Sequence, residues 1–102
     1  MRRGEIRAYE PVIPRPGISR LRLIVSADTL NDAKDRELIL GVHVVDHDPE
    51  SLLSPRVGDF GWAVVTTIER VVRSRISEVV GTATASEMEQ ISIALRTALD
   101  LD

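Results

Sequence analysis

The sequence contains no cysteine, and its 102 residues include only two histidines and three aromatic side chains. Without cysteine there can be neither a disulfide framework nor a thiolate metal site. The apolar runs are far shorter than the ~20 residues that a membrane span needs, and the arginine-rich start has no apolar signal core. We therefore expect a soluble, cytoplasmic protein that does not act at a membrane.

The length predicts a single domain over residues 1–102, large enough to bury roughly 60–70% of the surface of its unfolded chain. The formal net charge of −3 is unevenly distributed. Residues 1–22 carry six arginines against two glutamates, and none of these cations is a lysine: Arg2, Arg3, Arg7, Arg15, Arg20 and Arg22. A basic face of planar guanidinium groups suits a phosphate backbone or an acidic protein segment, although scattered solvated arginines would fit the composition equally well.

Apolar and β-branched runs predict strands at residues 5–9, 20–27, 38–45, 62–72 and 76–84. Two long loops, 11–19 and 46–61, contain all five prolines. Thr84 and Glu87 form a capping box, which predicts a final helix with an apolar stripe that serves as core or dimer interface. The absence of alternating strands and helices predicts an α+β fold, a mostly antiparallel small barrel of about five or more strands with a C-terminal helix.

His43 is the one imidazole within the apolar run Leu38–Val45. A histidine has an unperturbed pKa of about 6.5 and can transfer protons near neutral pH. The alternative interpretation is a core residue whose nitrogens are satisfied by neighbours. The other histidine, His47, stands between Asp46 and Asp48, but three adjacent loop residues cannot converge on one ion, so we expect neither a metal site nor a cofactor.

Several segments together resemble the MazF/PemK (Kid) toxins of the MazF/CcdB superfamily. They are "MRRGEI", the Pro/Gly loop ending at Arg20, "LRLIVSAD", and "RSRISEVVGTATASEMEQISIALRTALDL". The resemblance covers nearly the whole chain. It implies an SH3-like barrel, a homodimer, and the activity of a sequence-specific, ribosome-independent endoribonuclease that cleaves single-stranded mRNA and inhibits growth. It also implies an antitoxin partner with an acidic, disordered tail.

The family's cleavage centre pairs an arginine, normally followed by proline, with a threonine or serine at the end of a strand. Arg20 matches the arginine, with Leu21 in place of the proline. Laid over "ILGVH", the family pattern Val-Val-Pro-Ile-Thr puts His43 at the hydroxyl position. The resemblance thus predicts that Arg20 stabilises the phosphorane while His43 transfers protons. A toxin that lost its threonine and survives only as an antitoxin-binding module is the alternative.

Further RNA contacts are expected from Arg15, Arg22, Thr66 and Thr67, the two threonines standing where MazF toxins often carry Asp-Gln. The stretches "GDFGWAVVTT" and "SRLRLIV" are also similar to CcdB toxins, which poison DNA gyrase. CcdB toxins end in Trp-Gly-Ile, whereas this chain ends in Asp100-Leu101-Asp102, which argues against gyrase. Ribonuclease, gyrase poison and inert antitoxin-binding module therefore remain the three candidate functions.

Overall fold

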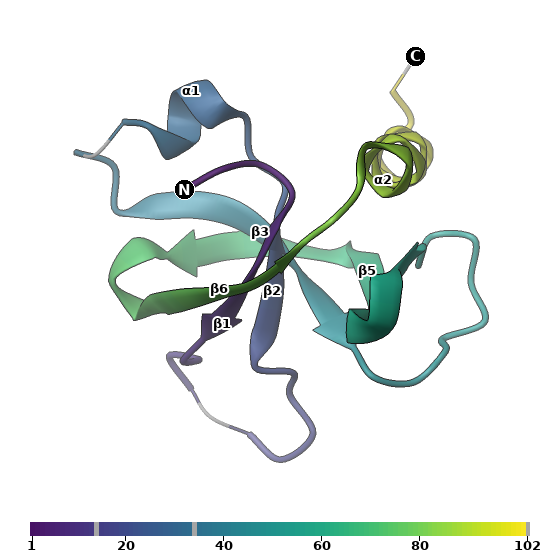
Figure 1. Ribbon diagram of the computed structural model, residues 1–102, viewed down its shortest axis with the longest axis horizontal. Helices are drawn as coiled ribbons and strands as arrows, with labels where there is room; N and C mark the ends of the chain where they lie inside the picture. The colour runs from purple at the N-terminus through teal and green to yellow at the C-terminus, as the bar shows by residue number, and fades with distance from the viewer. Residues whose placement is uncertain (14, 34, 102) are drawn as a thin grey trace.

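The computed structural model describes residues 1–13, 15–33 and 35–101. Six strands form one antiparallel sheet in the order β4-β5-β3-β2-β1-β6, curled into a half-barrel with a C-terminal helix (Figure 1). In chain order the elements are β1 (Glu5–Tyr9), β2 (Leu21–Ile24), α1 (Asp28–Asn31), β3 (Leu38–Val45), β4 (Arg56–Val57), β5 (Gly61–Val72), β6 (Ile76–Thr82) and α2 (Ala85–Leu99). The expected α+β fold is confirmed.

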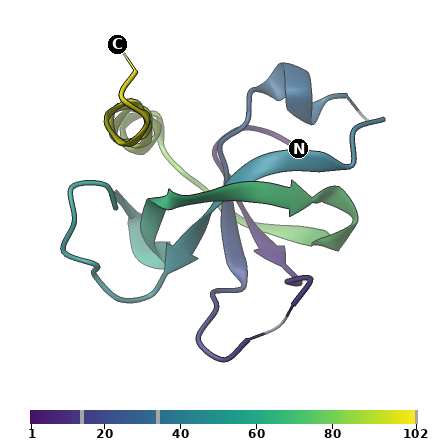
Figure 2. The ribbon, with the colours of Figure 1, turned by 180° about the vertical axis from the view of Figure 1, so that it is seen from behind.

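The strand β5 shapes the sheet. It is one continuous strand of 12 residues that runs alongside β3 (Figure 2) and pairs with both of its ends. The register of the β3–β5 pair shifts between Gly41 and His43 of β3. The segment 46–61, predicted to be a loop throughout, is a loop only in part. It contains β4, because the side chain of Val57 is buried and draws the segment back against the start of β5.

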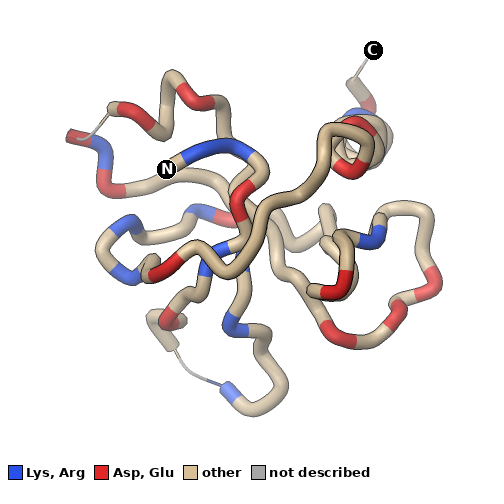
Figure 3. Tube along the Cα trace, viewed as in Figure 1, with Lys and Arg blue, Asp and Glu red and all other residues tan. Residues whose placement is uncertain are grey.

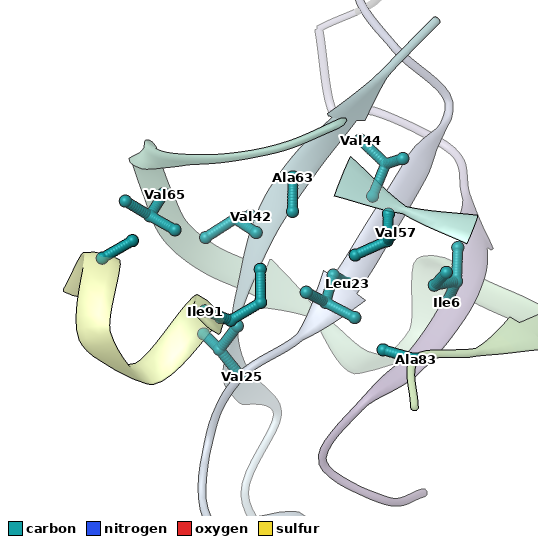
Figure 4. Close-up of a cluster of buried hydrophobic side chains, with 11 residues drawn as sticks. Ile6, Leu23, Val25, Val42, Val44, Val57, Ala63, Val65, Ala83 and Ile91 are labelled. Atoms are coloured by element: carbon teal, nitrogen blue, oxygen red, sulfur yellow. The ribbon is translucent and has the colours of Figure 1, made fainter. Parts of the chain in front are cut away.

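Two apolar clusters lie on opposite faces of the sheet, since neighbouring strand residues point to opposite sides. The larger one packs strand residues such as Leu23, Val42 and Val44 against Ile91 of α2 (Figure 4). The smaller one contains four buried residues, namely Tyr9, Ile24, Ile39 and Val71. The smaller cluster leaves room on its face for polar side chains.

The helix α2 begins at the predicted capping box. The Thr84 hydroxyl accepts the amide of Glu87, and the Glu87 carboxylate accepts the amide of Thr84. The second carboxylate oxygen of Glu87 accepts the Gly58 amide at 2.6 Å, which ties the turn before β5 to the helix. Ile91 is buried in the core, whereas Leu99 is half exposed. No helix in the described ranges has both the length and the apolar character to span a bilayer.

Candidate functional site

Arg22, His43 and Glu69 come together on the face of the smaller apolar cluster. Arg22 stands directly opposite His43 in the β2–β3 pair, and Glu69 stands opposite Gly41 in the β3–β5 pair. The valines flanking His43 enter the larger core, so alternation along β3 turns the imidazole to the other face. The adjacent strands therefore bring a guanidinium, an imidazole and a carboxylate together.

One oxygen of Glu69 joins the other two groups. Glu69 Oε1 lies 2.8 Å from Arg22 Nε and 3.0 Å from His43 Nε2. Arg22 Nη1 donates to the carbonyls of Ser19 and Leu21 at 2.6 and 2.9 Å. The guanidinium also lies 4.9 Å from the centroid of the Tyr9 ring. With its side chain only 2% exposed, Arg22 is held rigidly.

A cavity of about 240 Å³ opens over this cluster. The loop between β1 and β2 forms one wall, and Arg15 and Arg70 contribute two further guanidinium groups. With Arg22 the cavity has three cations and one carboxylate, Glu69, an excess of two positive charges when His43 is neutral. Arginines gather around this loop and the β5–β6 corner, whereas the loop after β3 is acidic (Figure 3). The cavity therefore favours an anion.

The environment of His43 lowers the pKa of its imidazole, so the ring loses its proton more readily than that of an ordinary histidine. Burial lowers the pKa of His43 below 6.5, and the positive charge of Arg22 lowers it further, while the charge and hydrogen bond of Glu69 oppose the shift. A histidine with a lowered pKa is unprotonated at neutral pH and can accept a proton. The side chain is 22% exposed, so a ligand in the cavity can reach it.

The lowered pKa of His43 predicts a pH dependence of stability. The unfolded chain binds the proton more tightly than the folded protein does, so the unfolding free energy should fall as the pH drops from about 6.5 through the folded-state pKa. His43→Gln should lose this contribution, whereas His47→Gln should keep it because it leaves His43 and its neighbours unchanged. Urea denaturation at a series of pH values measures the unfolding free energy of each variant as a function of pH. Equal pH dependence in the wild type and His43→Gln would contradict it.

At the register shift between β3 and β5, the side chain of Thr67 bonds to the backbone of both strands. Its Oγ1 accepts the amide of His43 at 2.8 Å and donates to the carbonyl of Val64 at 2.6 Å. The hydroxyl thereby completes the hydrogen bonding of β3 at the register shift. Thr66 points into solvent and is exposed. Of the two predicted RNA-binding threonines, Thr66 is freely accessible and Thr67 supports the backbone of His43.

Replacing Thr67 by valine should therefore cost more stability than the same change at Thr66. Thr67→Val leaves a backbone amide and a carbonyl without their partner, which costs about 1–3 kcal/mol of unfolding free energy. Thr66→Val should change it by less than about 0.5 kcal/mol. Chemical denaturation of both variants measures the difference. Equal stability losses would show that the Thr67 hydroxyl does not hold the strand.

Arg15 lies within the loop between β1 and β2, Arg20 is the last residue of that loop, and the two line different cavities. Arg20 Nη1 is 3.3 Å from Glu10 Oε2, its side chain is 65% exposed, and it lines a neighbouring cavity with Asp46 and His47. Among the described residues no hydrogen bond or ion pair joins Arg20 to His43. Arg15 is exposed and lines the cavity of His43. The pairing of Arg20 with His43 stays a prediction. The cation that stands opposite His43 and shares the carboxylate of Glu69 with it is Arg22.

Glu69 is the member of the cluster that sequence reasoning missed. It lies in the β-branched run "VVTTIERVV", where a charged residue is uncommon. That isolated carboxylate was the available signal. Its partners, however, stand 47 and 26 residues away along the chain, so only the strand register identifies them.

The arrangement of the sheet and helix is the fold of the MazF toxins. A mycobacterial endoribonuclease in complex with its cognate antitoxin aligns with a TM-score of 0.86 at 22% identity, over 100% of this chain and 97% of that one. MazF from Deinococcus radiodurans aligns with a TM-score of 0.81 at 15% identity, over 99% and 97%. The Mycobacterium tuberculosis toxin MazF-mt6 aligns with a TM-score of 0.76 at 12% identity, over 96% and 98%.

These likenesses extend over nearly the whole chain but have low sequence identity, so they establish the fold alone. No family model matches the sequence, and no curated protein matches it either. The resemblance to MazF toxins drawn from the sequence is confirmed in the structural neighbours. The chemistry must be argued from the site.

Proposed function

We propose that the protein is the toxin of a toxin–antitoxin pair and cleaves single-stranded RNA at the cavity of His43 without a metal ion. The observation that supports this most directly is the imidazole of His43, its pKa lowered by burial and by Arg22, beside the buried guanidinium of Arg22 in a basic cavity on a MazF-like fold. A proton acceptor and a fixed cation are what internal cleavage of RNA requires.

In the proposed reaction His43 takes the proton of a ribose 2′-hydroxyl, and the 2′-oxygen attacks the adjacent phosphorus. The P–O5′ bond breaks, the 5′-oxygen leaves with a proton from the protonated imidazole or water, and the other product ends in a 2′,3′-cyclic phosphate. Arg22 Nη2 has no hydrogen-bond partner among the described residues, and Arg22 lines the cavity. This nitrogen can donate to a phosphoryl oxygen and so stabilise the charge that develops there.

The flanking nucleotides would follow the arginines around the loop between β1 and β2. Arg15 and Arg70 line the same cavity as His43, and exposed Arg20 can contact a neighbouring phosphate. Thr66 is accessible for a hydrogen bond to a base. Single-stranded RNA fits because its phosphates and unpaired bases can both follow a curved surface.

The proposed protein partners are a second copy of the chain and an antitoxin. The strand β6 ends the described sheet and exposes two valines, Val79 and Val80, by 43% and 37%, which suits edge pairing with a second copy. An acidic antitoxin tail would compete with RNA for Arg15 and Arg70. Sedimentation equilibrium tests the dimer, and a monomer would refute it. Inhibition of cleavage by an acidic peptide tests the competition, and an unaffected cleavage rate would refute it.

The decisive experiment is incubation of a long, mixed-sequence RNA with purified protein in EDTA. We expect discrete cuts that leave 2′,3′-cyclic phosphate ends, and no cut where the nucleotide at the site is replaced by its 2′-deoxy form. RNA that stays intact in EDTA refutes the proposal. Gyrase-dependent DNA breakage, or tight antitoxin binding with neither activity, would then assign one of the other two functions.

Variants of the two arginines decide which of them stabilises the transition state. Arg22→Lys keeps a charge but loses the fork, and should lower kcat by about 10²–10³-fold. Arg20→Ala should raise KM and leave kcat nearly unchanged if Arg20 contacts a flanking phosphate. The opposite result, with an inactive Arg20→Ala and an active Arg22→Lys, would return the stabilising role to Arg20 as the family motif predicts.

A further inference from the structure

We propose that Glu69 is a positioning residue that fixes the tautomer of His43 and holds Arg22 beside it, so that His43 Nδ1 is the atom that accepts the proton. This inference rests on the proposed function but concerns a residue that matches no part of the MazF motif. It is carried by the position of Glu69 Oε1, 3.0 Å from His43 Nε2 and 2.8 Å from Arg22 Nε.

A carboxylate can only accept hydrogen bonds, so the contact with Glu69 places the imidazole proton on His43 Nε2. His43 Nδ1 then carries the lone pair. In the described part of the chain Nδ1 has no hydrogen-bond partner, and His43 lines the cavity. The cavity-lining imidazole thus has one nitrogen committed to the protein and one available to a ligand.

The same carboxylate oxygen keeps Arg22 in place. Its contact with Arg22 Nε adds to the two carbonyl contacts of Nη1, so Nη2 is the nitrogen left for a phosphate. Gly41 faces Glu69 across β3 and β5, and a side chain there would approach Cγ2 of Val71 to 2.8 Å. A glycine at this position preserves the close packing of the strands beneath the cluster.

The charged groups around His43 act in opposite directions. The carboxylate of Glu69 favours the protonated imidazole and Arg22 disfavours it. Arg15 and Arg70 line the same cavity, as does Tyr9, whose hydroxyl accepts the amide of Val72. Removing the charge of Glu69 while these cations remain should lower the pKa of His43 further.

The first test uses NMR and needs no activity. The ring ¹⁵N shifts of the wild type at neutral pH should show His43 protonated on Nε2, with His47 as the exposed reference. Glu69→Gln should lower the titration midpoint of His43 and change its tautomer population, while Glu89→Gln, on the exposed face of α2, should change neither. A wild-type His43 protonated on Nδ1, or an unchanged midpoint in folded Glu69→Gln, would overturn the inference.

The second test is kinetic and separates the two proposals. If the wild type cleaves RNA, Glu69→Gln should lower kcat at least about 10-fold with KM changed less than about twofold. The acid limb of its pH profile should move to lower pH, following the pKa of His43. If the wild type cleaves RNA and Glu69→Gln keeps its rate and profile, Glu69 has no positioning role. If the wild type is inactive, the proposed function fails while the NMR result still decides the role of Glu69.

Discussion

Replacement of His43 by alanine is expected to lower the rate of RNA cleavage by about 10²–10⁴-fold, the usual contribution of a positioned acid or base. No other histidine is near the cluster, because His47 lies in the exposed loop beside Asp46. The loss should appear in kcat, since the arginines proposed to contact the phosphates, Arg15, Arg22 and Arg70, remain in the cavity. Single-turnover cleavage of a labelled oligonucleotide measures it.

The matched control is His47→Ala, which removes the only other imidazole of the chain. It should cleave at the wild-type rate. Thermal unfolding and circular dichroism must show that His43→Ala is folded, because His43 is partly buried between β2 and β5. A folded His43→Ala with full activity would make the imidazole a structural residue and would move the search for the base elsewhere.

Replacement of Gly61 by alanine is expected to lower the unfolding free energy by at least about 3 kcal/mol. Gly61 begins β5 with a φ of +127°, and an added Cβ would overlap the carbonyl oxygen of Val45 and lie 2.9 Å from its carbonyl carbon. Both obstructing atoms are backbone, so no side-chain movement relieves the overlap. Thermal denaturation should show a midpoint lower by more than about 10 °C.

Gly17→Ala provides the control for Gly61→Ala. Gly17 also has a positive φ, +83°, but no atom lies within 4 Å of its added Cβ. Gly17→Ala should therefore lower the unfolding free energy only by the backbone strain of about 1 kcal/mol. Similar losses for the two variants would mean that strain alone, and not the approach of β3 to β5, sets the requirement for glycine at position 61.

Local patterns predicted the elements of this fold well. The run Leu38–Val45 is a strand with those bounds because apolar and β-branched residues continue without a turn signal. The capping box at Thr84 likewise starts α2 at Ala85, since its hydrogen bonds involve residues only three apart. The short strand β4 was missed because two residues carry no periodicity, and its pairing partner lies in β5.

The candidate site was predictable in part. His43 stood out as an imidazole in an apolar run, and alternation along β3 explains why it does not enter the larger core. Arg22 was expected to contact RNA at the surface, yet its side chain is almost completely buried. Burial of a cation is tolerated here because Glu69, two carbonyls and the ring of Tyr9 surround it.

The sequence by itself therefore determined every strand except β4, the start of the helix, the fold class and the unusual imidazole, because each depends on residues close together in the chain. Only the tertiary structure decided which charged groups meet. Arg22, His43 and Glu69 come from three strands, and the register shift between Gly41 and His43 determines their alignment. Pairing over such separations depends on the packing of the whole sheet, so no local pattern specifies the contact of Glu69 with His43 and Arg22.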